Sequence, residues 1–331
     1  MFDMFRNRKV LVAGGAGFVG INLINRLLES GASISATLHN KPAVIKDKKI
    51  RYLKCDLTKT KDCAQAVDGV DYVFMCAADT SGAAVMEKTP LVHVTPNVVM
   101  NTLMLEAAYE AGVQKFLFIS SNTVYPTAEH SVKEDEMIPG QLFEKYFCVG
   151  WMKQFTEVLC RIYAEKIKKP MNTIVVRPAN IYGPNDDFEW ETSHVLPALI
   201  RKVVERHNPI EVWGDGNDIK DFIYIDDFVE GILLAMEKLD TFIPVNIATG
   251  VPCSIREALD AILQADEYID ANIVFNGTKP TMIPKRLIDT TRAKQLLDFE
   301  AGTSIIEGIK KTVYWYRQTR GLAKPKNVTN H

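Results

Sequence analysis

The chain lacks several features that would assign it to particular classes of protein. Its six cysteines contain no C-x-x-C pair, and several lie in apolar runs, as reduced cysteines of a cytosolic protein do. Residues 1–9 have no apolar core of the kind that a secretory signal carries. No apolar run reaches the roughly 18 residues that a membrane span needs. We therefore expect a cytoplasmic protein with no membrane partner and no metal at its site.

A charge excess of either sign is missing as well. Lys and Arg number 39 and Asp and Glu number 41, so the net charge is −2. This balance gives no basic surface for a nucleic acid or an anionic membrane. Internal repeats and low-complexity tracts are also absent. What remains is an ordinary soluble composition, 47% hydrophobic, in 331 residues, which is enough for two domains or one large domain with a lobe.

A glycine-rich segment near the N-terminus is the most informative feature that is present. Residues 9–20 read KVLVAGGAGFVG, and an amphipathic stretch follows at 21–29. This order predicts a strand, a tight turn and a helix. Glycine lets the turn bend sharply and lets a ligand phosphate approach the backbone, and the helix N-terminus offers free N–H groups to an anion. Two spacings fit: Gly15, Gly17 and Gly20 make G-x-G-x-x-G, and Gly14, Gly17 and Gly20 make G-x-x-G-x-x-G.

Apolar runs and amphipathic stretches alternate through the first half of the chain. We expect strands at 10–13, 33–38, 51–55, 72–76, 115–120 and 172–177, and helices at 21–29, 62–67, 97–111 and 150–166. Such alternation predicts an α/β fold, a Rossmann doubly wound parallel sheet with helices on both faces. Ligands of such a sheet bind at the carboxyl ends of its strands.

The composition and the pattern of the sequence change after Pro178. Loops there carry more glycine and proline, and the apolar runs become short. We read this part as a smaller, mostly C-terminal substrate-binding lobe, from which a helix at 226–237 returns to the first domain. The expected division is 1–179 plus about 221–249 for the dinucleotide-binding domain and about 180–220 plus 250–322 for the lobe. Residues 323–331 are expected to be a flexible tail.

Short motifs are spread over nearly the whole chain. Besides the glycines they are Asp56-Leu57, Ala77-Ala78, Asn97, Ser120-Ser121-x-x-Val124-Tyr125, Arg177-Pro178, 180–184, 221–227 and Asn246-Ile247. Together they resemble the extended short-chain dehydrogenase/reductase family, in its NAD-dependent epimerase/dehydratase branch, which acts on nucleotide sugars. The second glycine spacing is also that of this family. Within it, segments 180–188 and 193–199 look most like GDP-fucose synthase-type enzymes.

The resemblance implies a reaction carried by a serine, a tyrosine and a lysine, here Ser121, Tyr146 and Lys153. In that family the tyrosine exchanges a proton with a sugar oxygen as a hydride moves to or from nicotinamide. A free tyrosine has a pKa near ~10, so the positive lysine helps by favouring phenolate. The lysine also holds the nicotinamide ribose, and the serine orients the reacting oxygen.

The family spacing Y-x-x-x-K is broken in this chain. Counted from Tyr146 the lysine position holds Gly150, and counted from Lys153 the tyrosine position holds Val149. A regular helix through both would separate Tyr146 from Lys153 by about 10 Å along its axis. Our hypothesis is that an irregular helix start brings Tyr146 back to Lys153. The rival is a lost or relocated proton donor, with Tyr146 only a packing aromatic.

A histidine and a threonine bear on the type of reaction. In GDP-fucose synthase-type enzymes a histidine acts as an acid during epimerisation with a cysteine as its partner base; these positions hold His194 and Thr123. A hydroxyl is a poor base beside a carbonyl, so double epimerisation is disfavoured. Asn122 and Thr123 stand where dehydratases carry acids, which disfavours dehydration. His194 could equally be a polar or nucleotide-facing residue.

The resemblance also implies the binding residues. Those for the cofactor are Gly14, Gly17, Phe18, Val19, Gly20, Leu38, His39, Lys41, Asp56, Leu57, Ala77, Ala78, Asn97 and Lys153. Those for the substrate are Thr123, Asn180, Val195, Lys202, Lys220 and Arg286. Residues 38–41 offer no carboxylate to repel a 2′-phosphate, and Lys41 or His39 could attract one. The expected cofactor is therefore NAD(P), with NADP favoured over NAD.

The leading expectation is a nucleotide-sugar epimerase or 4-ketoreductase that acts at C4 of a GDP- or UDP-hexose. The alternative is a catalytically weak relative that binds NAD(P) in a regulatory or structural role, and the altered tyrosine spacing motivates it. By analogy with the family we expect a homodimer, paired through a four-helix bundle of the helices at 97–111 and 150–166. Apolar positions such as Leu105, Val158 and Ile162 permit this pairing.

Overall fold

A seven-stranded parallel sheet forms the centre of the molecule. The structure is a computed structural model and describes residues 2–79, 89, 91–279 and 281–323. The strand order is β12-β7-β5-β4-β1-β2-β3, and every pair in it is parallel. Its strands are β1 (Lys9–Ala13), β2 (Ser33–Leu38), β3 (Ile50–Lys54), β4 (Tyr72–Met75), β5 (Lys115–Ile119), β7 (Asn172–Pro178) and β12 (Val245–Ile247). The expected doubly wound α/β fold is thereby confirmed.

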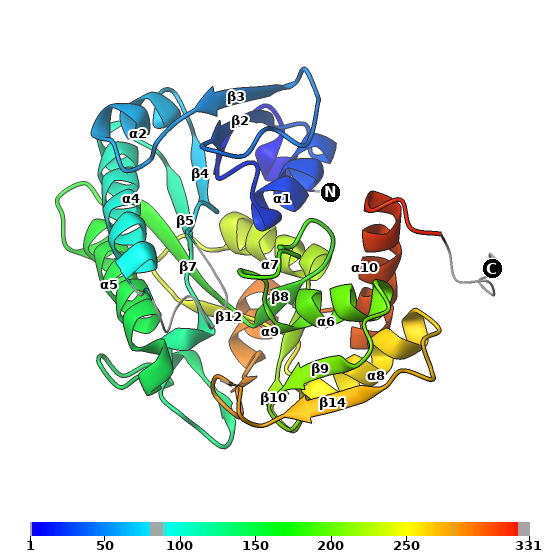
Figure 1. The fold of residues 1–331 in the computed structure, drawn as a ribbon. Helices are drawn as coiled ribbons and strands as arrows, with labels where there is room; N and C mark the ends of the chain where they lie inside the picture. The colour runs from blue at the N-terminus through cyan, green and yellow to red at the C-terminus, as the bar shows by residue number, and fades with distance from the viewer. Residues whose placement is uncertain (1, 80–88, 90, 280, 324–331) are drawn as a thin grey trace.

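Helices cover both faces of this sheet (Figure 1). One face carries α1 (Phe18–Glu29), α7 (Ile225–Lys238) and α9 (Thr291–Leu297), and the other carries α2 (Thr60–Val67), α4 (Leu91–Glu110) and α5 (Phe147–Glu165). Strand side chains alternate between the two faces, as β geometry requires. In β1, Val10 and Val12 join one buried cluster while Leu11 and Ala13 join the other.

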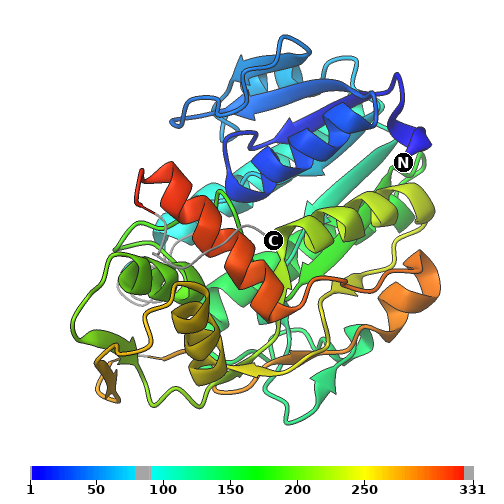
Figure 2. The same ribbon diagram turned by 90° about the vertical axis from the view of Figure 1, so that its right-hand side faces the viewer.

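The smaller lobe packs at one end of the sheet. Its helices are α6 (Val195–Val204), α8 (Ile255–Ala265) and α10 (Ile305–Thr319), which Figure 2 shows from the side. Its strands pair as β9 (Ile210–Trp213) with β14 (Ile273–Asn276), and β10 (Ile219–Lys220) with β13 (Cys253–Ser254). Two further pairs join β8 (Asn180–Tyr182) to β11 (Phe222–Tyr224) and β6 (Ser131–Val132) to β15 (Leu287–Ile288). Short 3₁₀ turns are η1 (Asp3–Phe5), η2 (Asn122–Val124), η3 (Glu134–Glu136) and η4 (Glu144–Tyr146).

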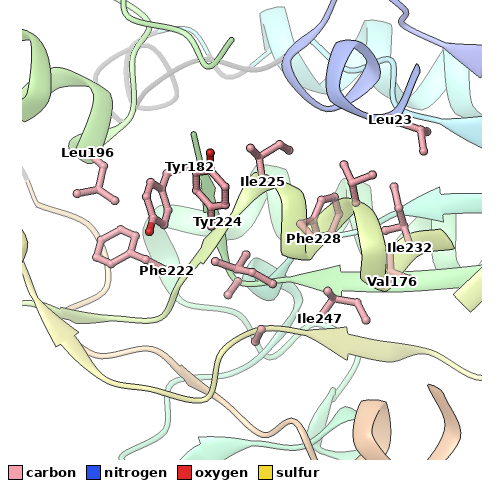
Figure 3. Packing of buried hydrophobic residues seen from close by; sticks show 14 of the residues in the cluster. Leu23, Val176, Tyr182, Leu196, Phe222, Tyr224, Ile225, Phe228, Ile232 and Ile247 are labelled. Atoms are coloured by element: carbon pink, nitrogen blue, oxygen red, sulfur yellow. The ribbon is translucent and has the colours of Figure 1, made fainter. Parts of the chain in front are cut away.

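One hydrophobic core runs from the sheet into the lobe. Figure 3 shows Tyr182, Phe222 and Tyr224 of the lobe strands beside Phe228 and Ile232 of α7. Strand β8 pairs with β11 across the expected boundaries near 180 and 221. The division of the chain into two domains at these residues therefore stays a prediction.

Two helices begin earlier than the sequence pattern predicts. Helix α4 begins at Leu91 rather than at 97 and contains Pro96, a residue that usually ends or begins a helix because it lacks an amide hydrogen. Helix α5 begins at Phe147 rather than at 150, directly after the 3₁₀ turn η4. The second difference matters for the site, because it fixes the place of Tyr146 at the start of a regular helix.

Some features are absent from the described part of the chain. There, no helix combines the length and the apolar character that crossing a membrane would require. No group of three or more His, Cys, Asp or Glu side chains within the described ranges could hold a metal ion. The six cysteines are free thiols.

Candidate active site

The glycine turn between β1 and α1 is shaped by close backbone contacts. Gly14 has a φ of +88°, and a Cβ there would lie 2.7 Å from the backbone of Ala77. A Cβ at Gly20 would collide with the carbonyl oxygen of Gly14. At Gly17, by contrast, an added Cβ would meet only that oxygen, at 3.3 Å. Gly14 and Gly20 therefore let strand, turn and helix pack, while Gly17 leaves the backbone open to a ligand.

Thr37 at the end of β2 holds this turn in place. Its hydroxyl accepts a 2.8 Å hydrogen bond from Gly14 N, and its carbonyl accepts one of 2.9 Å from Gly15 N. Gly17 caps α1 and has no side chain to occupy the first helix amides, which leaves them for an anion. The turn thus fits the pyrophosphate of a dinucleotide. Sequence reasoning missed Thr37, although a hydroxyl one residue before a strand end was a usable signal.

The expected adenosine residues follow β2 and β3. Leu38 ends β2, and His39 and Lys41 are exposed just after it. Asp56 follows β3, and hydrogen bonds from the Thr58 hydroxyl and amide lower the pKa of its carboxyl, assisted by the charges of Lys59 and His39. Leu57 is buried. A carboxylate therefore does lie beside His39, but it comes from the third strand rather than from the second.

Further candidate residues for the cofactor follow β4 in the chain. Ala77 and Ala78 come after this strand, separated from it by Cys76. The buried Asn97 of α4 donates hydrogen bonds to the carbonyls of Asp79 (2.8 Å) and His93 (2.6 Å), and its own oxygen accepts one from Asp79 N. Asn97 therefore fixes the backbone that follows Ala78.

Ser121 and Thr123 form a hydroxyl pair at the carboxyl end of β5. The amide and the hydroxyl of Thr123 donate to Ser121 Oγ at 3.1 and 3.0 Å. Because Ser121 accepts both bonds, its own O–H is left to donate elsewhere. Helix α5 passes close by, since a Cβ at Gly150 would lie 2.8 Å from the carbonyl oxygen of Thr123.

Lys153 lies beside the same strand end. Its Nζ donates a 2.8 Å hydrogen bond to the carbonyl of Ile119 and lies 4.8 Å from the centre of the Phe118 ring. The side chain is half-buried. Burial lowers the pKa of Lys153 to about 8, although the negative charge of Glu157 opposes the shift.

The phenol of Tyr146 lies close to two residues of the lobe, Arg286 and Ile283. This tyrosine caps α5, and burial raises the pKa of its phenol to about 12, which the Arg286 guanidinium and a backbone hydrogen bond from Ile283 partly offset. Helix α5 is regular from Phe147 onward, so seven residues separate Tyr146 from Lys153, about 10 Å along the axis. The hypothesis that an irregular helix start brings Tyr146 back to Lys153 stays a prediction, since Tyr146 lies in the 3₁₀ turn η4 directly before the regular helix. Any catalytic role of Tyr146 stays a prediction.

His194 lies on the lobe side at the start of α6. It is the N-cap residue and remains accessible to solvent, yet surrounding protein lowers its pKa, against the opposing charge of Asp187. Val195, the first residue of α6, is 39% exposed.

The three cations expected at the substrate diphosphate are bonded to the protein. Lys202 Nζ donates to the carbonyl of Glu211 at 2.6 Å, and Lys220 Nζ donates to that of Ile283. Arg286 is 2% exposed, and its two terminal nitrogens bond carbonyls of Tyr125 and Pro126. Lys220 and Arg286 are therefore buried and are not solvated surface charges.

Two further polar groups lie at this end of the site, and one of them lacks a hydrogen-bond partner among the described residues. Arg286 Nε is buried and has no hydrogen-bond partner among the described residues, so it can still bind a ligand. Asn180, by contrast, uses its amide to bond the carbonyl of Asp221 at 2.9 Å, which ties β8 to the start of β11.

Asp186 was missed by the sequence reasoning. One of its carboxyl oxygens is buried and has no hydrogen-bond partner among the described residues, and burial raises the pKa of the group to about 8. Its loop contacts α1, where the side chain of Asn22 donates to the carbonyl of Pro184 at 3.0 Å. A carboxyl that titrates near neutrality thus lies next to the helix that follows the glycine turn.

A buried polar network joins α5 and β7 to the end of β5. Glu157 of α5 accepts bonds from Arg177 on both oxygens, at 3.0 and 2.6 Å, and one of 2.5 Å from Ser120 Oγ. Arg177 also donates to the Tyr125 hydroxyl, which in turn donates to Asn246. Tyr125, Arg177 and Asn246 were motif residues without a stated role. In the structure they belong to the network that binds Ser120, the residue directly before Ser121, through Glu157.

A shallow hollow elsewhere on the surface is a poor candidate for the site. It is lined by Arg161, Phe242, Pro244 and Leu296 among others. Pro244 directly precedes β12, so the hollow lies at the amino end of that strand. Ligands of parallel sheets bind at the opposite, carboxyl end.

Comparison with known proteins agrees with this geometry. The model of the NAD dependent epimerase/dehydratase family matches residues 10–248. The chain belongs to this family. GDP-L-fucose synthase from Escherichia coli K12 is 28% identical over 327 residues, which cover 95% of this chain and 98% of that protein. GDP-mannose 3,5-epimerase 1 from Oryza sativa subsp. japonica is 28% identical over 97% of this chain and 84% of that protein.

A solved structure extends the likeness to three dimensions. UDP-glucose 4-epimerase from Thermotoga maritima, determined with UDP-glucose, superimposes with a TM-score of 0.85 at 25% identity. The match covers 94% of this chain and 99% of that one. As a member of the epimerase/dehydratase family, the chain is an NAD(P)-dependent enzyme of the epimerase and oxidoreductase type, which confirms the resemblance drawn from its motifs.

Proposed function

We propose that the protein is a nucleotide-sugar epimerase or 4-ketoreductase that acts by hydride transfer at C4 of a GDP- or UDP-hexose. The observation that carries this proposal is the placement of two groups on one edge of the sheet. The glycine turn follows β1, and Ser121, Thr123 and Lys153 gather at the end of β5, two strands away. Two strand spacings are about 10 Å, which suits a dinucleotide bound by its pyrophosphate at one end and reacting at the other.

In this proposal each residue has a separate task. Bound NAD(P) would supply the hydride acceptor or donor. Ser121 donates its free O–H to the reacting sugar oxygen, and Lys153 supplies donors to the nicotinamide ribose. His194, on the lobe side, would serve as an acid if an epimerisation beside the C4 carbonyl followed the hydride transfer. Thr123 is a poor base at the position where relatives carry cysteine, so we favour reaction at C4 over double epimerisation.

The substrate is proposed to lie between the end of β5 and the lobe. Thr123, Asn180, Val195, Lys202, Lys220 and Arg286 are the candidate contacts, and Arg286 Nε is the donor that remains free. Trp213, at the end of β9, was missed by sequence reasoning. It is 40% exposed with Lys279 Nζ 5.6 Å from its ring centre, and it offers an aromatic face on which a nucleobase could stack.

NADP is the proposed cofactor form. Leu38 replaces the acid that would repel a 2′-phosphate, and His39 and Lys41 are exposed beside it. The carboxylate of Asp56 lies near His39 and acts in the other direction. A direct comparison of NADP and NAD affinities therefore tests this part of the proposal by itself.

We also propose a cytoplasmic homodimer that pairs through α4 and α5. One side of α5 exposes an apolar stripe of Phe147, Trp151, Phe155, Val158 and Ile162, each between 39% and 51% exposed. Their spacing of three and four residues places them on a single helix face. Covering this stripe with the same stripe of a second copy gives a four-helix bundle. Light scattering would show a dimer, and Val158→Glu would shift it to a monomer.

A ligand screen tests the proposed activity. Purified protein is heated with GDP- and UDP-hexoses, with and without NADP, and bound ligands raise the melting temperature. We expect NADP to stabilise the protein and at least one nucleotide hexose to add to that effect. Protein that responds to neither would contradict the proposal.

One observation favours a second candidate function. Val149 occupies the tyrosine position of the family, and this chain could therefore bind NAD(P) as a regulatory subunit with little catalysis. In that case NADP would stabilise the protein, and no nucleotide sugar would change the redox state of the bound nicotinamide.

A further inference from the structure

The proton donor of the family reaction is displaced in this chain. Val149, one turn before Lys153, cannot exchange a proton, and the phenol of Tyr146 lies with Arg286 and Ile283 of the lobe. The proposed reaction still needs a group that takes the proton of a sugar hydroxyl or returns it to a carbonyl oxygen. Such a group must lie next to Ser121.

Lys153 has the surroundings that this task requires. One donor of its amine is used by the carbonyl of Ile119, and the Phe118 ring covers another side of it. An amine that donates one hydrogen bond keeps a lone pair when it is neutral and two further hydrogens when it is charged. Val149 offers no titratable group, whereas the bond to the Ile119 carbonyl holds the Lys153 amine at the end of β5, two residues before Ser121 of the hydroxyl pair.

We propose that Lys153 itself carries the proton at the sugar oxygen, in the role that a tyrosine has in relatives. This inference rests on the proposed function. In the oxidative direction the C4–H bond breaks and its hydride reduces NAD(P)⁺. The O4–H proton passes to the neutral Lys153 amine, which becomes an ammonium as the C4 carbonyl forms. In the reductive direction the same ammonium returns the proton, so electrons and protons balance.

The charges around Lys153 keep its amine close to the point of titration. Glu157 on α5 is the acid that acts on it, but Arg177 from β7 already occupies both oxygens of Glu157. From β5, the carbonyl of Ile119 and the ring of Phe118 contact the amine, and neither of them is charged. Burial therefore dominates, and the pKa of Lys153 falls to about 8, within the range of general acid–base catalysts.

A readout that needs no turnover comes first. In protein labelled with ¹³C-lysine, the signal that disappears in Lys153→Arg identifies Lys153, and its shift is followed against pH. We expect a midpoint near 8 in the cofactor-free protein. A midpoint close to the ordinary lysine value of about 10.4 would overturn the proposal.

Turnover of the nicotinamide in the presence of GDP- and UDP-hexoses supplies the second readout. Lys153→Arg keeps the charge but cannot release a proton at these pH values, so we expect a loss of roughly 10²- to 10⁴-fold. Lys166→Arg, on the exposed residue that caps the same helix, is the matched control and keeps its activity. The turnover rate of the wild type should change with pH around 8, where Lys153 titrates. This pH dependence should persist in Tyr146→Phe, since Tyr146 does not carry the proton.

Restoring the family spacing is the sharpest arm. Val149→Tyr places a phenol one turn before residue 153, so the double variant Val149→Tyr/Lys153→Arg has both a proton donor and a positive charge. We expect it to recover at least tenfold of the activity lost in Lys153→Arg. If the wild type is active and Lys153→Arg stays active, this inference alone is overturned. The same holds if Tyr146→Phe abolishes the dependence of the rate on pH near 8. A wild type without any nicotinamide turnover overturns the proposed function and this inference together.

Discussion

The glycine turn after β1 and the proposed reacting groups after β5 lie two strands apart in one sheet, yet they depend on different properties of the chain. The first is defined by backbone contacts, where a Cβ at Gly20 would collide with the Gly14 carbonyl. The second is defined by individual side chains, and Val149, at the position where the family resemblance predicts a tyrosine, lies within an unbroken α5. Substitution at Gly14 or Gly20 therefore disturbs the fold itself, whereas the proposed chemistry can be altered one residue at a time.

The largest effect on stability is expected at the buried Glu157–Arg177 ion pair next to the proposed reacting groups. Glu157→Ala leaves the buried Arg177 charge without its partner, and the free energy of unfolding should fall by about 3–5 kcal/mol. Glu165→Ala, on the same helix and paired with Arg161 at the surface, should change it by less than about 1 kcal/mol. Urea unfolding measures both. Similar losses in the two variants would show that the β5 side has no buried scaffold.

The glycine turn should respond to substitution position by position. Gly20→Ala forces a Cβ against the Gly14 carbonyl, with an expected loss of about 1–3 kcal/mol in unfolding free energy. Gly17→Ala should cost less stability, because its Cβ meets only one atom, but it should weaken stabilisation by NADP. Thermal melts with and without NADP separate the two effects. The comparison fails if Gly17→Ala melts lower than Gly20→Ala.

A smaller effect is expected in the pH dependence of stability. Lys153 has a pKa of about 8 when folded and about 10.4 when unfolded. Between these values the unfolded chain binds more protons at this residue, so the free energy of unfolding should rise with pH. Below pH 8 both states are protonated and the contribution is flat. Urea unfolding from pH 7 to 10.5 should show this rise in the wild type, and equal slopes in Lys153→Met would contradict it.

The smallest expected change concerns the choice of cofactor. Lys41 is exposed after β2, so Lys41→Glu should weaken NADP binding by no more than about fivefold and leave NAD binding unaltered. Titration calorimetry with both nucleotides measures this. An equal effect on NAD and NADP would remove Lys41 from the 2′-phosphate site.

Local patterns predicted the parts of the fold that depend on local burial. The strand Ser33–Leu38 and the order of strand, glycine turn and helix follow from apolar runs and glycine spacing. The predicted start of α4 at 97 was wrong, because the helix begins at Leu91 and continues through Pro96. The family could be read from motifs because these are short and contiguous.

Side-chain directions in the site could not be predicted in the same way. Lys220 and Arg286 look like surface cations in the sequence, but strand β10 and the segment at 283–286 meet and bury them against carbonyls. The Glu157–Arg177 pair joins residues 20 positions apart on different elements. The placement of Tyr146 depends on where α5 begins, and helix starts are poorly determined by periodicity.

The most direct test of a working site is the redox state of the nicotinamide after sugar is added. Purified protein saturated with NADP⁺ or NADPH is mixed with each GDP- and UDP-hexose and with the corresponding 4-keto sugars, and the absorbance of reduced nicotinamide is followed. The account predicts a change with at least one nucleotide sugar, despite Val149 in the tyrosine position. Bound nicotinamide that remains unchanged with every sugar would contradict it and identify a cofactor-binding protein without this chemistry.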